Sequence, residues 1–481
     1  MSFQLSAACR LCGVCTLAVA CRTAAPASAP AESPVKSGQP GEDIVRSLPG
    51  YRSELLEAPV FGGQAFLMEA GDPSSPAVVF VHGLGESGCR DWYPVLPAVA
   101  ARYHVVAFDL PGFGRSTHAN ALYSPARYAE FIHGLLGPRL RSPFHLVGHS
   151  MGGAISLFYA ARFPADVMRL LLIDAAGILH RKAFVNFAVE AGLDNLLGLL
   201  ARPVKDLATL ATETTSTVLG PVKLPVSPDP SLILTSDALR ATLLGTPTRI
   251  AAMAVILENF APAIDNVRSP TWILWGSNDA IASPRAGLIL QARLPSAQLT
   301  VLENSGHDPM ASRPAAVERF LLEALAAPAA PAGPRTASPF PVLPSRKGRC
   351  QGEISSHFDG DYAEIEIERC TEVVLRDVRA ASLRIRDSYV TVEKTRIVGE
   401  GTALDVKGSR VRITASDFVG DVALAVGGSD LDLAGVELRG RRAAIEVLGD
   451  SKLILSVSRA ESPLAQRYLH DVFELGEGAK I

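Results

Sequence analysis

The chain has 481 residues, more than one compact domain usually holds, and 48% of them are hydrophobic, which excludes global disorder. Its formal net charge of −3 gives no electrostatic reason to expect nucleic acid as a partner. Two stretches rich in alanine and proline, residues 22–48 and 327–348, are expected to be flexible linkers. They separate a leader, a central region and a C-terminal region.

Residues 1–21 have the features of a signal peptide. Arg10 is the only charge, and the apolar stretch 11–20 has the length of an h-region but is too short to span a bilayer. Two processing sites fit: a small-residue site at 18–20, or a lipobox-like run in which Cys21 is lipidated and attaches the protein to a membrane. An alanine-rich start that is never cleaved is the third alternative. Cleavage at either site places the protein in the cell envelope, in the periplasm or outside the cell.

In the central region, residues 49–326, short apolar strands alternate with helices. Near-continuous apolar strands of this kind are typical of a parallel sheet that is buried on both faces. The expected strands are 76–82, 104–110, 144–148, 169–175, 271–276 and 297–303, with helical patterns such as 154–163 and 315–327 between them. Residues 179–265 break the alternation with a mostly helical insertion, which we expect to cover a site.

The C-terminal region, residues 349–481, changes to short alternating strands with an internal repeat. Similar strands begin at spacings of 21, 20 and 22 residues, at Ser388, Ser409, Ser429 and Ser451. Two strands per unit of about twenty residues favour an all-β module that forms a short right-handed parallel β-helix. A small antiparallel β-sandwich is the alternative. We expect the module to be a spacer, or a surface that binds the envelope or a glycan.

The seven cysteines allow one obvious disulfide bond. Export permits disulfides, and Cys350 and Cys370 are then the candidate pair. Cys89 is left over, and we interpret it as a small buried residue. Spacing alone leaves open that all the thiols stay reduced.

The stretch FHLVGHSMGG, residues 144–153, ends an apolar strand at Ser150, between Gly148 and Gly152. G-x-S-x-G between a strand and a helix predicts a nucleophile elbow, a turn too sharp for side chains at the flanking positions. The turn would expose the serine hydroxyl as a nucleophile. His149, beside the serine, is expected to be a packing residue.

Two backbone N–H groups would complete a site for an oxyanion. One belongs to Leu84 in HGLGES, which directly follows an apolar strand, and the other to Met151, just after the serine. His82 and Gly83 precede Leu84 and are expected to shape its loop.

A base and an acid follow in the order Ser…Asp…His. Asp279 in WGSNDAI and His307 in ENSGHDP each lie just past an expected strand. His307 would take the Ser150 proton, and Asp279 would fix the imidazole tautomer. Asp174 also ends a strand and is the rival acid, although the GSND context favours Asp279. Asp109 is expected to tie down a loop. No histidine has ligand spacing, so neither a metal site nor a cofactor is expected.

Five motifs in this order resemble the α/β-hydrolase superfamily, over residues 50–326. They are HGLGES (82–87), DLPGFGRS (109–116), GHSMGG (148–153), GSNDAI (276–281) and SGHDPM (305–310). The resemblance implies the α/β-hydrolase fold: a mostly parallel eight-stranded sheet with helices on both faces, and a helical cap, residues 179–265, that shapes the substrate pocket. The C-terminal module lies outside the resemblance.

These observations together favour an exported serine hydrolase that cleaves a small-molecule carboxylic ester through an acyl-enzyme on Ser150. The cap favours a modest apolar acyl group. One alternative is a hydrolase of C–C bonds in ring-cleavage products, since those relatives share the DLPGFGRS-like and SMGG motifs. The other is a non-catalytic envelope-binding scaffold with a vestigial hydrolase domain.

Overall fold

The computed structural model describes residues 41–140, 143–192, 231–294, 296–328, 343–463 and 465–479. The expected signal peptide, its Cys21 and most of the first linker lie outside these ranges. Residues 41–48, predicted to belong to that linker, instead include helix α1 (Glu42–Arg46). The folded region begins before the predicted boundary because Val45 is fully buried in a hydrophobic core.

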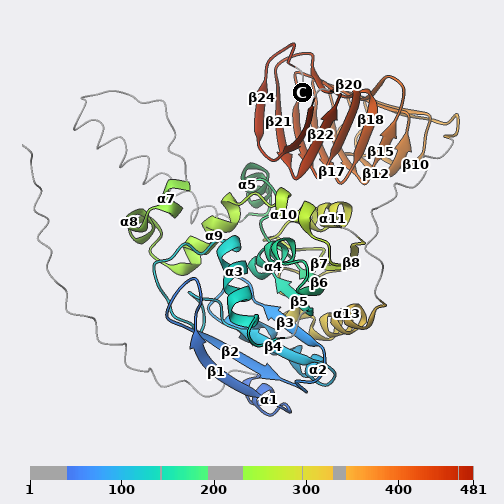
Figure 1. The fold of residues 1–481 in the computed structure, drawn as a ribbon. Helices are drawn as coiled ribbons and strands as arrows, with labels where there is room; N and C mark the ends of the chain where they lie inside the picture. The colour runs from blue at the N-terminus through green and yellow to red at the C-terminus, as the bar shows by residue number, and fades with distance from the viewer. Residues whose placement is uncertain are drawn as a thin grey trace, which may run out of the picture. The chain divides into compact units, whose positions relative to one another are not determined.

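The central region contains an eight-stranded sheet in the order β1-β2-β4-β3-β5-β6-β7-β8 (Figure 1). The strands are β1 (Arg52–Glu57), β2 (Gln64–Ala70), β3 (Ala77–Val81), β4 (His104–Phe108), β5 (Phe144–His149), β6 (Val167–Ile173), β7 (Thr271–Gly276) and β8 (Gln298–Leu302). From β4 to β8 all neighbours in this order are parallel, whereas β2 is antiparallel to both of its neighbours, β1 and β4. The mostly parallel sheet of the α/β-hydrolase fold is therefore confirmed.

One strand differs from its prediction. Residues 297–303 were expected to be buried on both faces, but β8 lies at the edge of the sheet and pairs only with β7. Each residue of β8 is exposed or half-buried. Val301, for example, is 46% exposed. An edge strand is more exposed because it lacks a second neighbour, and its own sequence does not predict that position in the sheet.

Two helical layers cover the two faces of the sheet, as alternate residues of β3 show. Val79 and Val81 join the core formed with α3 and α4, whereas Val78 and Phe80 join the core formed with α2 and α13. The other helices are η1 (Gly88–Trp92), α2 (Leu96–Ala100), α3 (Pro125–Leu136), α4 (Met151–Arg162), α5 (Arg181–Glu190), α7 (Ser231–Thr235), α8 (Asp237–Leu239), η2 (Arg240–Leu244), α9 (Pro247–Leu257), α10 (Ala261–Asn266), α11 (Pro284–Arg293), α12 (Pro309–Ser312) and α13 (Pro314–Ala326). Of the described helices, none has the length and apolar character needed to cross a membrane.

The C-terminal region is built almost entirely from strands that pair in parallel. They are β9 (Lys347–Gln351), β10 (His357–Asp361), β11 (Glu364–Glu368), β12 (Val373–Ala380), β13 (Ser382–Arg386), β14 (Tyr389–Glu393), β15 (Arg396–Val398), β16 (Thr402–Lys407), β17 (Arg410–Thr414), β18 (Asp417–Gly427), β19 (Asp430–Ala434), β20 (Glu437–Val447), β21 (Ser451–Ser456), β22 (Ser458–Ser462), β23 (Ala465–Leu469) and β24 (Val472–Leu475). Tyr389 pairs with Arg410, Arg410 with Asp430, and Asp430 with Lys452, so each strand pairs with its equivalent one repeat later. Among the strands that the structure describes here, antiparallel pairs occur only where β23 and β24 pair with β22 and β21.

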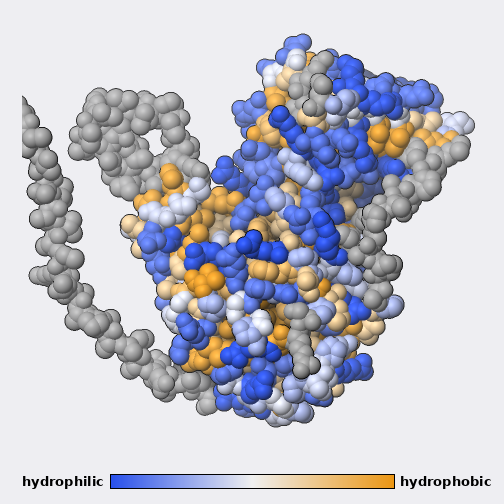
Figure 2. Space-filling view, in the orientation of Figure 1, coloured by the Kyte–Doolittle hydropathy of each residue, from blue (hydrophilic) through white to orange (hydrophobic). Residues whose placement is uncertain are grey.

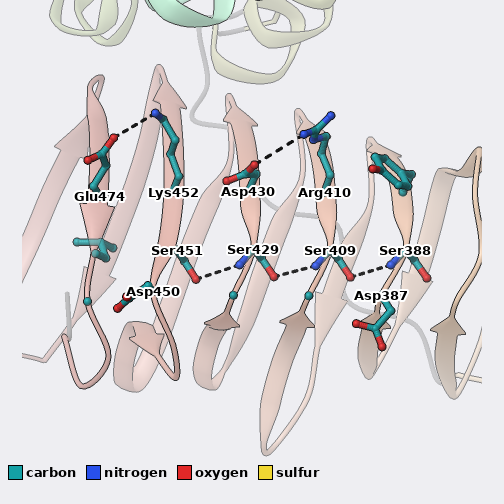
Figure 3. Close-up of a pocket in the computed structure, with 15 residues that line it drawn as sticks. Asp387, Ser388, Ser409, Arg410, Ser429, Asp430, Asp450, Ser451, Lys452 and Glu474 are labelled. Carbon is teal, nitrogen blue, oxygen red and sulfur yellow. Dashed lines mark hydrogen bonds and ion pairs between the residues drawn. The ribbon is translucent and has the colours of Figure 1, made fainter.

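The four repeat serines form a ladder of hydrogen bonds from strand to strand (Figure 3). The N–H groups of Ser388, Ser409 and Ser429 each donate to the Oγ of the next serine, at 3.1–3.3 Å. Each Oγ donates in turn to the carbonyl two residues before it, at 2.6–2.9 Å. The serines are buried, so their hydroxyls satisfy backbone groups that have no water beside them. Serine therefore recurs in the sequence because its hydroxyl supplies the hydrogen bonds that the buried backbone requires at each bend.

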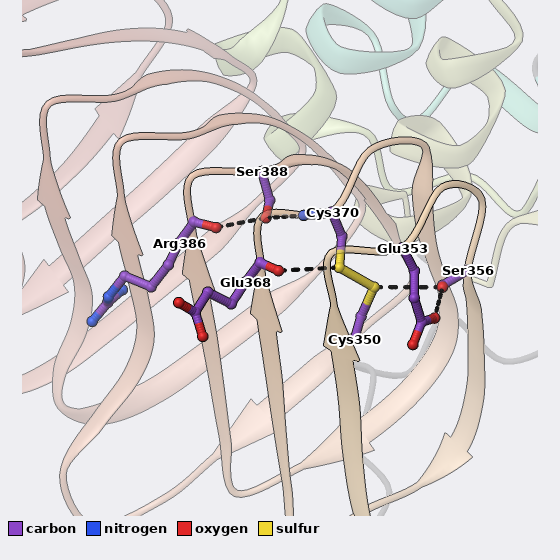
Figure 4. The surroundings of a disulfide bond; sticks show 7 residues. All are labelled: Cys350, Glu353, Ser356, Glu368, Cys370, Arg386 and Ser388. Carbon is purple, nitrogen blue, oxygen red and sulfur yellow. Dashed lines mark hydrogen bonds between the residues drawn. A yellow bond between two sulfur atoms is a disulfide. The ribbon is translucent and has the colours of Figure 1, made fainter.

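A disulfide bond joins Cys350 and Cys370 at the first of these repeats (Figure 4). Both residues are buried, and the N–H of Cys370 donates to the Oγ of Ser388 at 2.9 Å. The bond and the serine ladder therefore meet at the same turn. Cys89 is a free, buried thiol.

We predict that Ser409→Ala lowers the stability of the chain by about 1–3 kcal/mol, because it leaves the buried N–H of Ser388 without its partner. Ser382→Ala is the control: Ser382 is only half-buried, at the start of β13, and its loss should change stability by less than about 0.5 kcal/mol. Denaturant unfolding of the full chain measures both. Equal stability of the two variants would contradict the role given to the ladder.

Candidate active site

Ser150 lies in a sharp turn between β5 and α4. Its backbone has φ 52° and ψ −118°, a conformation that side chains disfavour and that is typical of functional turns. A Cβ on Gly148 would lie 2.4 Å from the carbonyl oxygen of Gly152, and one on Gly152 would lie 2.1 Å from that of Val81. Neither position has room for a side chain, which explains the two glycines of the motif.

Ser150, His307 and Asp279 form a continuous chain of hydrogen bonds. The Oγ of Ser150 is 2.8 Å from Nε2 of His307, and Nδ1 of the same ring is 2.8 Å from Oδ2 of Asp279. The other oxygen of Asp279 accepts from the N–H groups of Ile281 and Ala282. A carboxylate held in this way keeps Nδ1 protonated, which leaves Nε2 free to accept the serine proton.

Leu84 and Met151, the predicted oxyanion donors, line the same cavity as Ser150 and His307. Met151 is the first residue of α4, so its N–H is one of those that a helix leaves without an internal acceptor. The helix dipole adds positive potential at this end. Leu84 lies on the loop after β3. The residues that could stabilise an oxyanion are thus brought to the serine.

His82 and Gly83 hold the loop that carries Leu84. Nδ1 of His82 donates to the Gly83 carbonyl at 2.7 Å, and Nε2 accepts from the Leu110 N–H at 2.9 Å. Burial lowers the pKa of His82 and keeps the ring neutral, as these two roles require. A Cβ on Gly83 would lie 3.1 Å from Cβ of Ser150, so the loop approaches the serine closely.

Asp109 ties down two neighbouring loops. One oxygen accepts from the N–H of Cys89, and the other accepts from the backbone N–H and Nε of Arg115, all at 2.8 Å. Burial opposes the charge of Asp109, but Arg115 outweighs it and the pKa is lowered. Burial raises the pKa of the Cys89 thiol well above its usual value, which disfavours the thiolate, the nucleophilic form.

His149 has a role that sequence analysis missed. It was expected only to pack, but its Nε2 donates to the backbone carbonyl of His307 at 2.7 Å. Burial, with a smaller effect of His307, lowers the pKa of His149 to about 3, so the donor is a neutral ring. The residue beside the serine therefore fixes the loop that carries His307. The only local signal was the position of His149 next to Ser150.

The rival acid, Asp174, makes no hydrogen bond to His307, whose two ring nitrogens face Asp279 and Ser150. It is fully buried at the end of β6, and its Oδ1 accepts from the N–H of Gly276 at 2.8 Å. Of the two candidates, Asp279 holds the imidazole. In the described part of the chain no three His, Cys, Asp or Glu residues are placed to hold a metal ion.

Ser150 and His307 open into a cavity of about 400 Å³ with a mainly apolar lining. The insertion supplies much of its wall, through Phe184 of α5 and through Val255 and Ile256 of α9. The face of the molecule drawn in Figure 2 is largely hydrophilic with smaller hydrophobic patches, in contrast to this lining. A site of this kind suits an apolar substrate group beside a reactive polar one.

A model of the Alpha/beta hydrolase family matches residues 78–320, half of the chain. The match covers Ser150, Asp279 and His307 and ends before the C-terminal module. The chain therefore belongs to the alpha/beta hydrolase family.

The relatives match about half of the chain. An uncharacterized protein of Mycobacterium tuberculosis, Rv2715, is 31% identical over 264 residues, which are 52% of this chain and 76% of that protein. Lipase 1 of Psychrobacter immobilis is 28% identical over 251 residues, 52% of this chain and 76% of the lipase. The 2-hydroxy-6-oxo-2,4-heptadienoate hydrolase of Pseudomonas putida is 29% identical over 246 residues, 50% of this chain and 83% of the hydrolase.

We predict that His149→Asn lowers kcat by about 10- to 100-fold with little change in KM, because a small shift of a base costs rate at this scale. His149→Gln should restore most of the rate, since its amide N–H reaches the position of the histidine Nε2. Ester turnover and thermal unfolding are measured together.

His145 supplies the control for this pair of variants. It is buried on the same strand and its Nδ1 has no partner among the described residues. His145→Gln should keep the wild-type kcat. A His149→Asn variant that turns over esters at the wild-type rate would show that the bond to His307 has no part in activity.

Proposed function

We propose that this protein is a serine hydrolase that cleaves carboxylic esters through an acyl-enzyme on Ser150. The observation that carries the proposal is the chain from Ser150 through His307 to Asp279, which opens into an apolar cavity. The similarity to a bacterial lipase supports the same reaction class.

In the proposed reaction, His307 takes the Ser150 proton as the serine oxygen attacks the ester carbonyl. The negative charge moves to the carbonyl oxygen, where the N–H groups of Leu84 and Met151 stabilise it. Asp279 stabilises the imidazolium. The C–O bond then breaks, and His307 gives its proton to the departing alcohol. Water repeats these steps on the acyl-enzyme and releases the acid.

The volume of the cavity indicates the length of the acyl chain that it can hold. A methylene takes about the volume of a water molecule, roughly 30 Å³, so a cavity of about 400 Å³ has room for about a dozen carbons. We therefore propose medium-chain acyl esters as substrates, with the chain against Phe184, Val255 and Ile256. Residues 193–230 of the insertion lie outside the described part.

A C–C bond hydrolase is the second candidate, because the Pseudomonas putida relative is named for such a substrate. That substrate carries a carboxylate. None of the described residues that line the cavity is an arginine or a lysine. An apolar wall leaves a carboxylate without a partner, which favours the ester.

We propose further that the chain is exported and that Cys21 carries a lipid, which would place the enzyme on a membrane of the cell envelope. The Cys350–Cys370 disulfide supports an oxidising compartment. For residues 343–479 we propose that the parallel ladders close into a short right-handed β-helix, which binds the envelope or a glycan.

We predict that turnover of p-nitrophenyl esters peaks at acyl chains of about six to ten carbons and falls beyond about twelve, as the cavity volume requires. Ser150→Ala is the background control. Faster turnover of a vinylogous 1,5-diketone acid than of any ester would favour C–C hydrolysis. No turnover of either substrate class would favour the scaffold alternative.

A further inference from the structure

Asp174 is a buried carboxyl group to which the proposed reaction gives no task. It directly follows β6, which pairs with the strand that leads to Asp279, and it is fully buried. Its φ of 46° lies in the left-handed region, which is uncommon for a residue with a side chain. A strained, buried acid at this edge of the sheet calls for a physical reason.

One oxygen of Asp174 holds the turn that carries Asp279. Oδ1 accepts from the N–H of Gly276 at 2.8 Å, and the carbonyl of Gly276 accepts from the N–H of Asp279 at 3.2 Å. Asp174 thus fixes the first residue of the turn, and the last residue of the turn holds His307.

The same turn is packed against the loop of the base. A Cβ on Gly276 would lie 2.5 Å from the carbonyl oxygen of Ser305 and 2.5 Å from that of Gly306, just before His307. The N–H of Asn278 donates to the Ser305 carbonyl at 2.9 Å. A displacement of Gly276 would therefore move both the acid and the base.

The second oxygen, Oδ2 of Asp174, is buried and makes no hydrogen bond of ordinary geometry to any described residue. Burial raises the pKa of Asp174 to about 9, helped by the charge of Asp279, a hydrogen-bond interaction with Asp279 and the charge of Asp308; the Gly276 N–H opposes the rise. An ionised carboxylate with one buried oxygen that accepts no hydrogen bond would destabilise the folded state, whereas a carboxylic acid can direct its O–H toward Asp279.

We propose that Asp174 is a positioning residue that holds the Gly276–Asp279 turn as a neutral acid, with its O–H directed toward Asp279. The pair then carries one negative charge, which faces the His307 imidazolium as it forms. The role rests on the proposed function, in which His307 is the base.

The proposal predicts opposite results for two substitutions of similar size. Asp174→Asn keeps an oxygen for the Gly276 N–H and an N–H for Asp279, so kcat should stay within about threefold and the pH–rate profile should not move. Asp174→Leu loses both, and kcat should fall about 100-fold with KM little changed, as a displaced turn requires.

Two results would overturn the proposal. An Asp174→Asn variant that loses as much activity as Asp174→Leu, with the acidic limb of its pH–rate profile moved to lower pH, would show that Asp174 acts as an ionised carboxylate. An Asp174→Leu variant with wild-type kcat would show that Asp174 does not position the turn.

A stability measurement tests the neutral state without any substrate. The folded-state pKa of Asp174 lies above its unfolded value, so the unfolded chain binds fewer protons between about pH 4 and 9 and stability falls as the pH rises. Asp174→Asn removes this loss, so the Tm of the variant minus the wild-type Tm should increase from pH 5 to pH 9. A Tm difference that does not change with pH would refute the neutral state.

Asp109 is the matched control, because it is an equally buried carboxyl just after β4 that is paired with Arg115. Its pKa is lowered, so its contribution to stability is already complete above its unfolded pKa, and Asp109→Asn should lower the Tm by an amount that does not change from pH 5 to pH 9. Inactivity of the wild-type chain on every ester would refute the proposed function but leave the Tm comparison valid. The two failures can therefore be told apart.

Discussion

The whole site depends on one constraint, the close approach of three backbone segments around Ser150. The carbonyl of Val81 at the end of β3 and the first turn of α4 leave no space for side chains at positions 148 and 152. Glycine at both positions allows a turn that lifts the serine oxygen above the sheet. The proposed oxyanion donors, base and acid are arranged around Ser150, whose position is fixed by these contacts.

The parallel sheet brings the remaining groups to this point. Leu84, Ser150, Asp174, Asp279 and His307 follow β3, β5, β6, β7 and β8, and the carboxyl ends of parallel strands meet at one edge. Buried neutral groups then hold the loops: His82 for the oxyanion loop, His149 for the base. Burial lowers the pKa of both rings and so favours the neutral form, in which one ring nitrogen donates a hydrogen bond to a backbone carbonyl.

Sequence analysis predicted the parts of this site whose signals are local. The elbow and the strand ends before Asp279 and His307 are each encoded by a few adjacent residues. The contact of His149 with the His307 carbonyl joins segments far apart, and no local pattern encodes it. The exposure of β8 depends on its place in the sheet order. Helix α1 was not predicted because the composition of its segment is typical of a linker.

The central claim is that the Ser150 oxygen is an activated nucleophile, and a fluorophosphonate probe tests it most directly. The reagent forms a covalent bond with a serine that a neighbouring base activates. After digestion, mass spectrometry should place the label on Ser150 in the folded wild-type chain, with no label in Ser150→Ala and strongly reduced labelling in His307→Ala. A folded wild-type chain without label at Ser150, or equal labelling of the His307 variant, would contradict the account.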